Sequence, residues 1–307
     1  MGDLLRRYGT GLTAAFVLLT AFWLLILLIL PNLTMFESSF RPYLPVTEIG
    51  GPKDIYSLQN YTSIFENPVE VSLFGIPFSL GVRIKVFLLT LFYSGVVTVI
   101  AFILAYPLSY YLAKIVSPRS LPTLFLLLFV PLWVSEVLRS FAWFIILTLK
   151  GPLNAVLMAV GLIDTEIRWI AGFSPVIIGL VYTYVLFMVF PIYNAMQSLD
   201  SNQIEAAEDL GSPWWRTHLR VILPHAKPGI ASGSVMVFML SAGSILVPTI
   251  LGGTTVQWFT QTIQTWMLEA LDWNTGAAFA FILLILCTVF VFAMMRIFRV
   301  KLSDIAK

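Results

Sequence analysis

The sequence predicts an all-α integral membrane protein in which six transmembrane helices form a single domain over residues 1–307. Composition is the first observation: 59% of the residues are hydrophobic, only 11% are charged, and the mean hydropathy is +0.90. Soluble domains carry about 25% charged residues, so this chain could not keep its surface in water. The second observation is a series of charge-free runs long enough to cross about 30 Å of hydrocarbon. A net charge of +2 argues against nucleic acid as a partner.

Four spans follow directly from charge-free runs, since a crossing needs about 20 apolar residues. The first helix is expected to remain attached as an anchor, because its apolar core is too long for a signal peptide and no small-residue cleavage site follows it. The lone Cys287 lies in the last run and is expected to pack as a small hydrophobe. These four spans are predicted at 12–31, 86–113, 172–196 and 275–297.

The third and fifth spans need more argument. The third, 121–142, meets Glu136 and Arg139 only near its exit end, at a rise of about 1.5 Å per residue. The fifth, 229–249, belongs to a charge-free run that continues to residue 268. The second half of that run is rich in Gln, Thr and Trp, which predicts a water-facing loop with a short interfacial helix.

The distribution of Lys and Arg predicts that both termini are cytoplasmic. Six basic residues are expected on the outer side: Arg41, Lys53, Arg83, Lys85, Lys150 and Arg168. More are expected inside: Arg6, Arg7, Lys114, Arg119, Arg216, Arg220, Lys227, Arg296, Arg299, Lys301 and Lys307. The segment 32–85 is then a large extracytoplasmic loop, and its mixed charges and prolines favour a folded or draped cap.

Several kinds of chemistry have no sequence signal. No phosphate-binding G-x-x-x-x-G-K-[ST] motif occurs, so the chain is not expected to bind a cofactor or hydrolyse ATP. His218 and His225 lack further ligands for a metal and are interpreted as neutral surface histidines. No charge falls clearly at the bilayer centre, where an ion-driven transporter commonly has its relay. The driving force is therefore expected to come from a partner, the alternative being a self-sufficient secondary transporter or channel.

The cytoplasmic loop 197–228 carries the strongest local pattern, a helix–turn–helix. Asp200, Ser201 and Asn202 are candidate helix N-caps, and Gly211 suits a C-terminal turn with positive φ. A second helix is expected to start at Pro213, to bury an apolar stripe, and to stop at Pro224. The stripe comprises Trp215, Leu219 and Ile222. Such a hairpin suits lipid headgroups, with Trp214 and Trp215 as anchors, as well as a protein partner.

The same loop resembles a known family. Glu205–Ala206–Ala207, then Gly211, then 221–224 (Val-Ile-Leu-Pro) is similar to the E-A-A…G…I-x-L-P loop of the membrane subunits of binding-protein-dependent ABC importers. Position 221 is Val where that pattern usually has Ile. Four further stretches resemble the spermidine/putrescine branch of this family: 131–143, 151–154 with 161–164, 251–253, and 272–273 with 276–278.

The resemblance implies a type I importer permease in the bacterial inner membrane. Its expected partners are two cytoplasmic ATPase subunits, which hold ATP and Mg²⁺, a second permease subunit that is related but different, and a periplasmic solute-binding protein. The residues implied in coupling to the ATPase are Glu205, Ala206, Ala207, Gly211, Leu223 and Pro224. The permease itself would be a transport subunit and not an enzyme.

A polyamine is the solute that this branch implies, with opines, aminophosphonates and amino-acid derivatives as alternatives. Ammonium groups on methylene chains need carboxylates and aromatic faces along their path. The candidates are Glu136, Trp133, Tyr182, Tyr184, Glu269 and Asp272, with Trp143 and Trp258 beside them. Each has a structural alternative, since Glu136 can pair with Arg139 at i, i+3 and the tryptophans can be interfacial belt residues.

Overall fold

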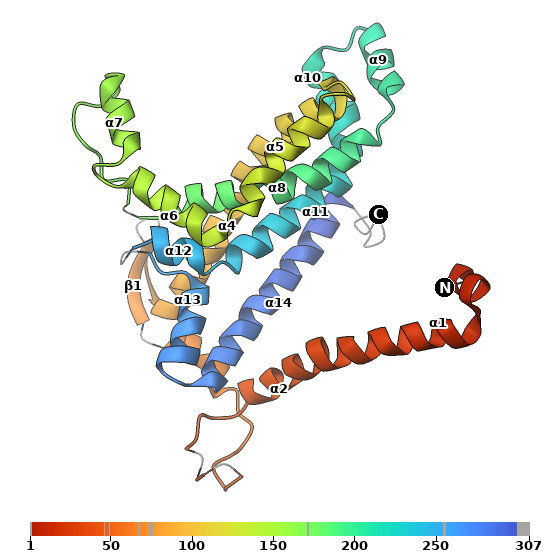
Figure 1. Ribbon diagram of the computed structural model, residues 1–307. Coiled ribbons are helices and arrows are strands. Elements are labelled where there is room, and N and C mark those ends of the chain that lie inside the picture. The colour runs from red at the N-terminus through yellow and green to blue at the C-terminus, as the bar shows by residue number, and fades with distance from the viewer. Residues whose placement is uncertain are drawn as a thin grey trace. The chain divides into compact units, whose positions relative to one another are not determined.

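A computed structural model describes residues 2–45, 47–48, 50–66, 68–73, 76–170, 172–253 and 256–299 (Figure 1). Where a single domain was predicted over 1–307, the backbone contacts divide the chain into two compact units. The first comprises Met1–Gly81 and Ile263–Leu284, and the second comprises Val82–Thr262 and Ile285–Lys307.

Three helices packed against one another form the core of the second unit (Figure 1): α4 (Val82–Tyr110), α8 (Ser174–Gln197) and α11 (Leu223–Ala242). A five-residue π-helix, η3 (Tyr111–Ile115), continues α4. The contact between α8 and α11 is close because it uses glycines: a Cβ on Gly229 would lie 2.3 Å from the Pro191 carbonyl oxygen. Gly229 and Gly233 therefore serve the close packing of α11 on α8.

The helix predicted over 121–142 is broken. It consists of α5 (Leu121–Trp133) and α6 (Glu136–Leu147), bent by 86°. The break has two local causes, since Pro131 removes a backbone donor inside α5 and the Ser135 side chain starts a new helix by accepting a bond from the Leu138 N–H. A short helix, α7 (Pro152–Ala159), follows.

The predicted stop at Pro224 and the predicted fifth span of 229–249 both need correction. Helix α11 begins at Leu223 and ends at Ala242, and a separate short helix, α12 (Leu246–Leu251), follows. Pro224 lies in the first turn of α11, where its missing N–H costs little, and the π-helix η4 (His218–Ile222) precedes it directly.

Trp258 and Phe259 contradict the water-facing loop predicted for residues 252–268. Both are fully buried in the second unit. The Trp258 indole N–H donates to the Ser241 carbonyl at 3.1 Å, and the Phe259 N–H donates to Thr90 Oγ1 at 2.9 Å. Two short helices follow, α13 (Phe259–Gln264) and the π-helix η5 (Thr265–Glu269). Composition could not predict this burial, because the polar groups of this segment are hydrogen-bonded to residues distant in sequence instead of to water.

The first unit contains helical and extended parts. Helices α1 (Gly2–Leu24), η1 (Leu25–Ile29) and α2 (Leu30–Ser39) follow one another along the chain, with a non-helical Gly9. Helix α3 (Gln59–Thr62) and the 3₁₀ turn η2 (Ser63–Phe65) precede an antiparallel β-hairpin. Its strands, β1 (Pro68–Leu73) and β2 (Ile76–Gly81), pair from Pro68 with Gly81 to Leu73 with Ile76. The sequence did not predict this hairpin, so the fold is helical with one small addition.

Hydrogen bonds within the first unit hold the segment after α2 against the start of α14 (Trp273–Phe298). The Asn274 side-chain amide donates to the Arg41 carbonyl at 2.8 Å, and the Asn60 amide donates to the same carbonyl at 2.8 Å. Arg41 also pairs with Glu37 at 2.6 Å and Asp54 at 3.0 Å. The hydrogen bonds to Tyr56 and Glu37 raise the pKa of Arg41 because they favour its charged form.

Within the described residues, four helical stretches are long and apolar enough to cross a membrane: Gly9–Ser39, Val82–Ile115, Ser174–Gln197 and Trp273–Phe298. The bent pair α5–α6 makes a fifth if it is counted as one span. Helix α11 does not meet the same criterion, because its first half contains His225 and Lys227. The count of six crossings stays a prediction.

Candidate functional site

The helix–turn–helix predicted in the loop 197–228 is present as a helical hairpin, defined here as residues 199–222. Asp200 caps α9 (Ser201–Asp209) by accepting a bond from the Asn202 N–H at 3.0 Å. At the other end, the Ser212 N–H bonds to the Ala207 carbonyl at 3.0 Å and the Gly211 N–H bonds to the Glu208 carbonyl at 2.8 Å. This pair of bonds is a Schellman motif, and Gly211 has the positive φ of 75° that it requires.

The helical hairpin presents most of its motif residues to the outside. Ile204 is the buried residue of α9, whereas Glu205 and Ala206 are exposed and Ala207 is half-buried. Large apolar side chains are also uncovered, with Leu210 89% and Trp214 75% exposed. A carboxylate, small alanines and exposed apolar groups together form a surface that suits a protein partner.

The second helix of the hairpin differs from its prediction. Pro213 is its N-cap, α10 covers Trp214–Thr217, and the helix passes through η4 into α11. Of the predicted apolar stripe, Ile222 is buried at 1% exposure, but Trp215 and Leu219 are 48% and 57% exposed. The i, i+4, i+7 pattern assumed an α-helix, and the wider π turn rotates successive side chains away from that spacing.

His218 is not the free surface histidine that the sequence suggested. It is half-buried, and its Nδ1 shares a hydrogen bond of 2.9 Å with the Tyr106 hydroxyl of α4. The ring also meets Tyr110 edge to face, with centroids 4.5 Å apart. Burial lowers the pKa of His218 from its usual 6.5. His225 is exposed, and its Nε2 lies 3.0 Å from the Ser198 hydroxyl.

Lys114 makes a second contact with the helical hairpin that sequence reasoning missed. Its ammonium group donates from η3 to the carbonyl of Leu199, at the start of the helical hairpin. Tyr106, Tyr110 and Lys114 are far from the hairpin in sequence, and no local pattern marks a contact between residues so separated. Hydrogen-bonding side chains near the C-terminal end of the second predicted span were the only available signal.

Among the candidate path residues, the structure brings Glu136 and Tyr184 together. The Tyr184 hydroxyl donates to Glu136 Oε1 at 2.9 Å, and Tyr184 is buried. Arg139 does not form an ion pair with Glu136, so the i, i+3 pairing considered for these two described residues is wrong. Arg139 donates instead to the Thr183 carbonyl at 3.4 Å. Glu136 thus keeps an unneutralised carboxylate at the first position of α6.

Aromatic candidates lie close to this carboxylate in the chain. The Trp143 and Tyr182 rings meet edge to face with centroids 5.5 Å apart, and Tyr182 is 41% exposed. Trp133, at the end of α5, is 78% exposed. Trp258 is fully buried and belongs to the packing of the second unit, which removes it from a solute path.

Glu269 and Asp272 belong to the first unit. Glu269 is exposed at the end of η5. Asp272 caps α14, accepting bonds from the Asn274 N–H at 3.1 Å and from the Thr275 N–H at 3.0 Å. The cap gives Asp272 a structural role that the sequence did not separate from a binding role.

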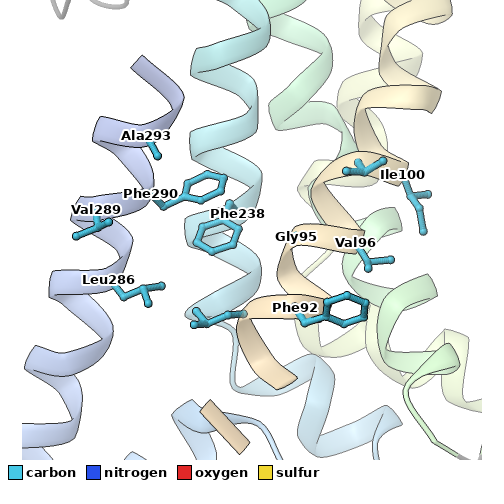
Figure 2. A pocket seen from close by; sticks show the side chains of 11 residues that line it. Phe92, Gly95, Val96, Ile100, Phe238, Leu286, Val289, Phe290 and Ala293 are labelled. Carbon is cyan, nitrogen blue, oxygen red and sulfur yellow. The ribbon is translucent and has the colours of Figure 1, made fainter. Parts of the chain in front are cut away.

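An open cavity of about 710 Å³ is lined by α4, α11 and α14 within the second unit, and Figure 2 shows its lining side chains. Phe238 and Phe290 stack at its edge with centroids 3.6 Å apart, and Gly95 leaves room beside them. Every lining side chain is apolar: Leu91, Phe92, Gly95, Val96, Val99, Ile100, Phe238, Leu286, Val289, Phe290 and Ala293. Such a cavity offers nothing to an ammonium group and suits hydrocarbon. In the described part of the chain, no three His, Cys, Asp or Glu side chains are grouped to hold a metal ion.

Comparisons with known proteins agree with the helical hairpin motif. Residues 98–304 match the model of the family described as "Binding-protein-dependent transport system inner membrane component". The spermidine/putrescine transport system permease protein PotB of Salmonella typhimurium (strain SL1344) is 33% identical over 92% of this chain and 94% of its own length. The protein of the same name from Escherichia coli (strain K12) is 34% identical over 83% and 86%.

The fold is also known from a solved structure, that of a bacterial alginate ABC transporter in complex with an alginate pentasaccharide-bound periplasmic protein. Its matching chain has a TM-score of 0.71 at 19% identity and covers 98% of this chain and 99% of its own. The hairpin motif, the family match over most of the sequence, and the level of identity to curated permeases lead to one conclusion. The chain belongs to the family of inner membrane components of binding-protein-dependent transport systems.

Proposed function

We propose that this chain is the permease subunit of an ATP-driven polyamine importer. Spermidine or putrescine would be received from a periplasmic binding protein and passed across the inner membrane. Support comes from the relatives, which are spermidine/putrescine permeases by name and align with most of the chain. Membership of a binding-protein-dependent family replaces the alternative of a self-sufficient secondary transporter or channel.

The proposal assigns the energy input to partner chains. Two cytoplasmic ATPase subunits would hold ATP and Mg²⁺, and a second permease subunit, related but different, would complete the path. The helical hairpin would dock on an ATPase through Glu205, Ala206 and Ala207, of which Glu205 and Ala206 are exposed as docking requires. Both termini and this hairpin would then be cytoplasmic, and the segment 32–85 would face outward.

One observation within the fold carries the choice of a cationic solute: the Glu136 carboxylate, positioned by the buried Tyr184 hydroxyl and free of Arg139. A carboxylate in a partly dehydrated site attracts an ammonium group strongly, and the Trp143 and Tyr182 rings of the same two helices offer aromatic surface for cation–π contact. The same fold occurs in a transporter of alginate, so the side chains must determine the solute.

The test is uptake of radiolabelled spermidine and putrescine by cells that lack their own polyamine importers and express this chain with its companion subunits. We expect Glu136→Gln to reduce uptake about tenfold, since a desolvated charge-assisted bond is lost, while the protein level is unchanged. Glu166→Gln is the matched control, because that carboxylate is exposed in the loop after α7.

Competition separates a polyamine from the other solutes. Unlabelled putrescine should suppress spermidine uptake, and an excess of an opine or an aminophosphonate should not. Equal uptake by Glu136→Gln and wild-type cells would contradict the cationic path, and uptake of an anionic solute alone would replace the polyamine assignment.

A further inference from the structure

We infer that Lys114 and His218 are positioning residues that tie both ends of the helical hairpin to the C-terminal end of α4, so that α4 is the helix that receives the hairpin's motion. The inference rests on the proposed coupling function of this hairpin. It adds a route by which movement of the hairpin reaches the transmembrane core.

The first tie holds the beginning of the hairpin. Lys114 in η3 donates a hydrogen bond to the carbonyl oxygen of Leu199, and the Leu199 side chain is buried at 3% exposure. Asp200, the cap of α9, lies near enough to attract the same ammonium group. One lysine therefore bonds to Leu199, where the chain leaves α8, and attracts the carboxylate of Asp200, where α9 begins.

The second tie holds the end of the hairpin. The His218 imidazole bonds to the Tyr106 hydroxyl at 2.9 Å, and the ring lies between Tyr110 and Trp214, with centroids 4.5 Å and 5.8 Å away. Tyr106 and Tyr110 stand one turn apart on α4, so His218 contacts one face of that helix. This contact is polar and aromatic, and it reaches the hydrophobic core because Tyr106 and Tyr110 also pack against it.

Both ties lie at places where the helix is irregular. Lys114 belongs to the π-helix η3, and His218 begins the π-helix η4. A π turn inserts an extra residue and is less well bonded than an α turn, and such turns recur at functional sites. Hydrogen bonds thus join η3 to the start of the hairpin and η4 to α4.

Helix α4 can pass a displacement on because it is bonded and packed to the rest of the core. The buried Ser109 hydroxyl, between Tyr106 and Lys114 in sequence, donates to the Val189 carbonyl of α8 at 2.9 Å. Helix α4 also packs against both α8 and α11. A hairpin that moved while both ties held would carry the end of α4 with it, and α8 would follow.

The experiment uses the assembled transporter in proteoliposomes, with its ATPase, second permease and binding protein. The measured quantity is the number of ATP molecules hydrolysed per solute imported, together with the amount of ATPase that copurifies. Lys114→Met and His218→Leu each remove one tie and keep the apolar volume. Lys114→Arg and His218→Asn keep a hydrogen-bonding group at the position of Nζ or Nδ1.

We expect Lys114→Met and His218→Leu to hydrolyse about fivefold more ATP per solute, the factor that corresponds to the loss of one net hydrogen bond. ATPase copurification should not change, since the docking residues of α9 are intact. Lys114→Arg and His218→Asn should hydrolyse nearly as few ATP molecules per solute as the wild type. Tyr106→Phe should match His218→Leu, and the double variant should be no worse than either single variant.

Three results would overturn the inference. A wild-type ratio in both Lys114→Met and His218→Leu would mean that the ties carry no motion. Equal damage in the conservative and non-conservative variants would show that side-chain volume, and not the hydrogen bond, matters. Loss of ATPase from all four variants would make the ties purely structural. If the wild-type complex neither binds an ATPase nor imports solute, the proposed function fails instead.

Discussion

At the scale of single residues, Gly211 shows how one backbone conformation shapes the exposed helical hairpin. Its φ of 75° closes the Schellman motif, and no atom lies within 4 Å of where a Cβ would stand. A side chain at this position would therefore meet no steric obstacle. The cost of substitution comes from the left-handed backbone alone.

Gly211→Val should destabilise the turn by about 1 kcal/mol or more, because a β-branched residue disfavours positive φ. Gly211→Asn is the matched control, since Asn tolerates this conformation. Glu205→Ala should leave α9 helical and remove a charge from the docking surface. We expect the Val and Ala variants to retain less ATPase on copurification and to lose solute-stimulated turnover. A lipid-bound hairpin predicts the reverse, with loss of membrane contact on replacing Trp214 and Trp215.

His218 makes the hairpin sensitive to acid. Because burial lowers its pKa below 6.5, the unfolded segment binds a proton more readily than the folded one. The free energy of unfolding of the hairpin is therefore highest above about pH 6.5. It falls as the pH drops below the pKa that His218 has in the unfolded segment. The facing groups Tyr106, Tyr110 and Trp214 do not titrate in this range.

The measurement is limited proteolysis of the hairpin between pH 5 and pH 8 in the purified protein. Cleavage of the wild type should accelerate below pH 6.5, and His218→Asn should remove that acceleration while keeping the hydrogen bond to Tyr106. The same pH dependence in the wild type and in His218→Asn would show that groups other than His218, such as carboxylates, cause the effect.

At the scale of elements, breaks and close contacts decide where helices lie. Helix α5 ends at Trp133 because the next residues adopt extended backbone and Ser135 caps a new helix. The break places Glu136 in the first turn of α6, where a carboxylate interacts favourably with the helix dipole. A continuous helix would have given Glu136 a different neighbourhood.

The contact between α8 and α11 depends on glycine. In Gly229→Ala the new Cβ would lie 2.3 Å from the Pro191 carbonyl oxygen and 2.8 Å from the Ala195 Cβ, so the helices must separate. We expect a loss of about 1–3 kcal/mol of stability and a lower Tm in detergent. The control is Gly95→Ala on α4, where no atom lies within 4 Å and Ala is the better helix former. An unchanged Tm for Gly229→Ala would contradict this packing.

At the scale of the whole molecule, the apolar runs predict six crossings, and the distribution of basic residues then predicts that both ends lie inside. A periplasm-active reporter fused after Lys307 should be inactive, and one inserted after Glu48 should be active. These two positions are predicted to lie on opposite sides of the membrane. Cytoplasm-active reporters at the same positions should give the complementary result. Activity of the periplasmic reporter after Lys307 would leave an odd number of crossings, and α11 would be the first helix to reconsider.

The sequence by itself determined the membrane class, the approximate position of most apolar helices, the Asp200 and Gly211 caps, and the family. These properties depend on composition, run length and local backbone preference, all of which act within a few residues. The motif of the helical hairpin is of the same kind, since a cap and a glycine turn are specified by their immediate neighbours.

Tertiary structure alone decided that Trp258 is buried and that Glu136 bonds to Tyr184 instead of Arg139. It also joined Lys114 and Tyr106 to the helical hairpin. Each of these outcomes is a choice between partners of similar intrinsic strength. A carboxylate, an indole or an ammonium group bonds to whichever complementary atom the packing of distant helices brings within 3 Å, and no local pattern contains that distance.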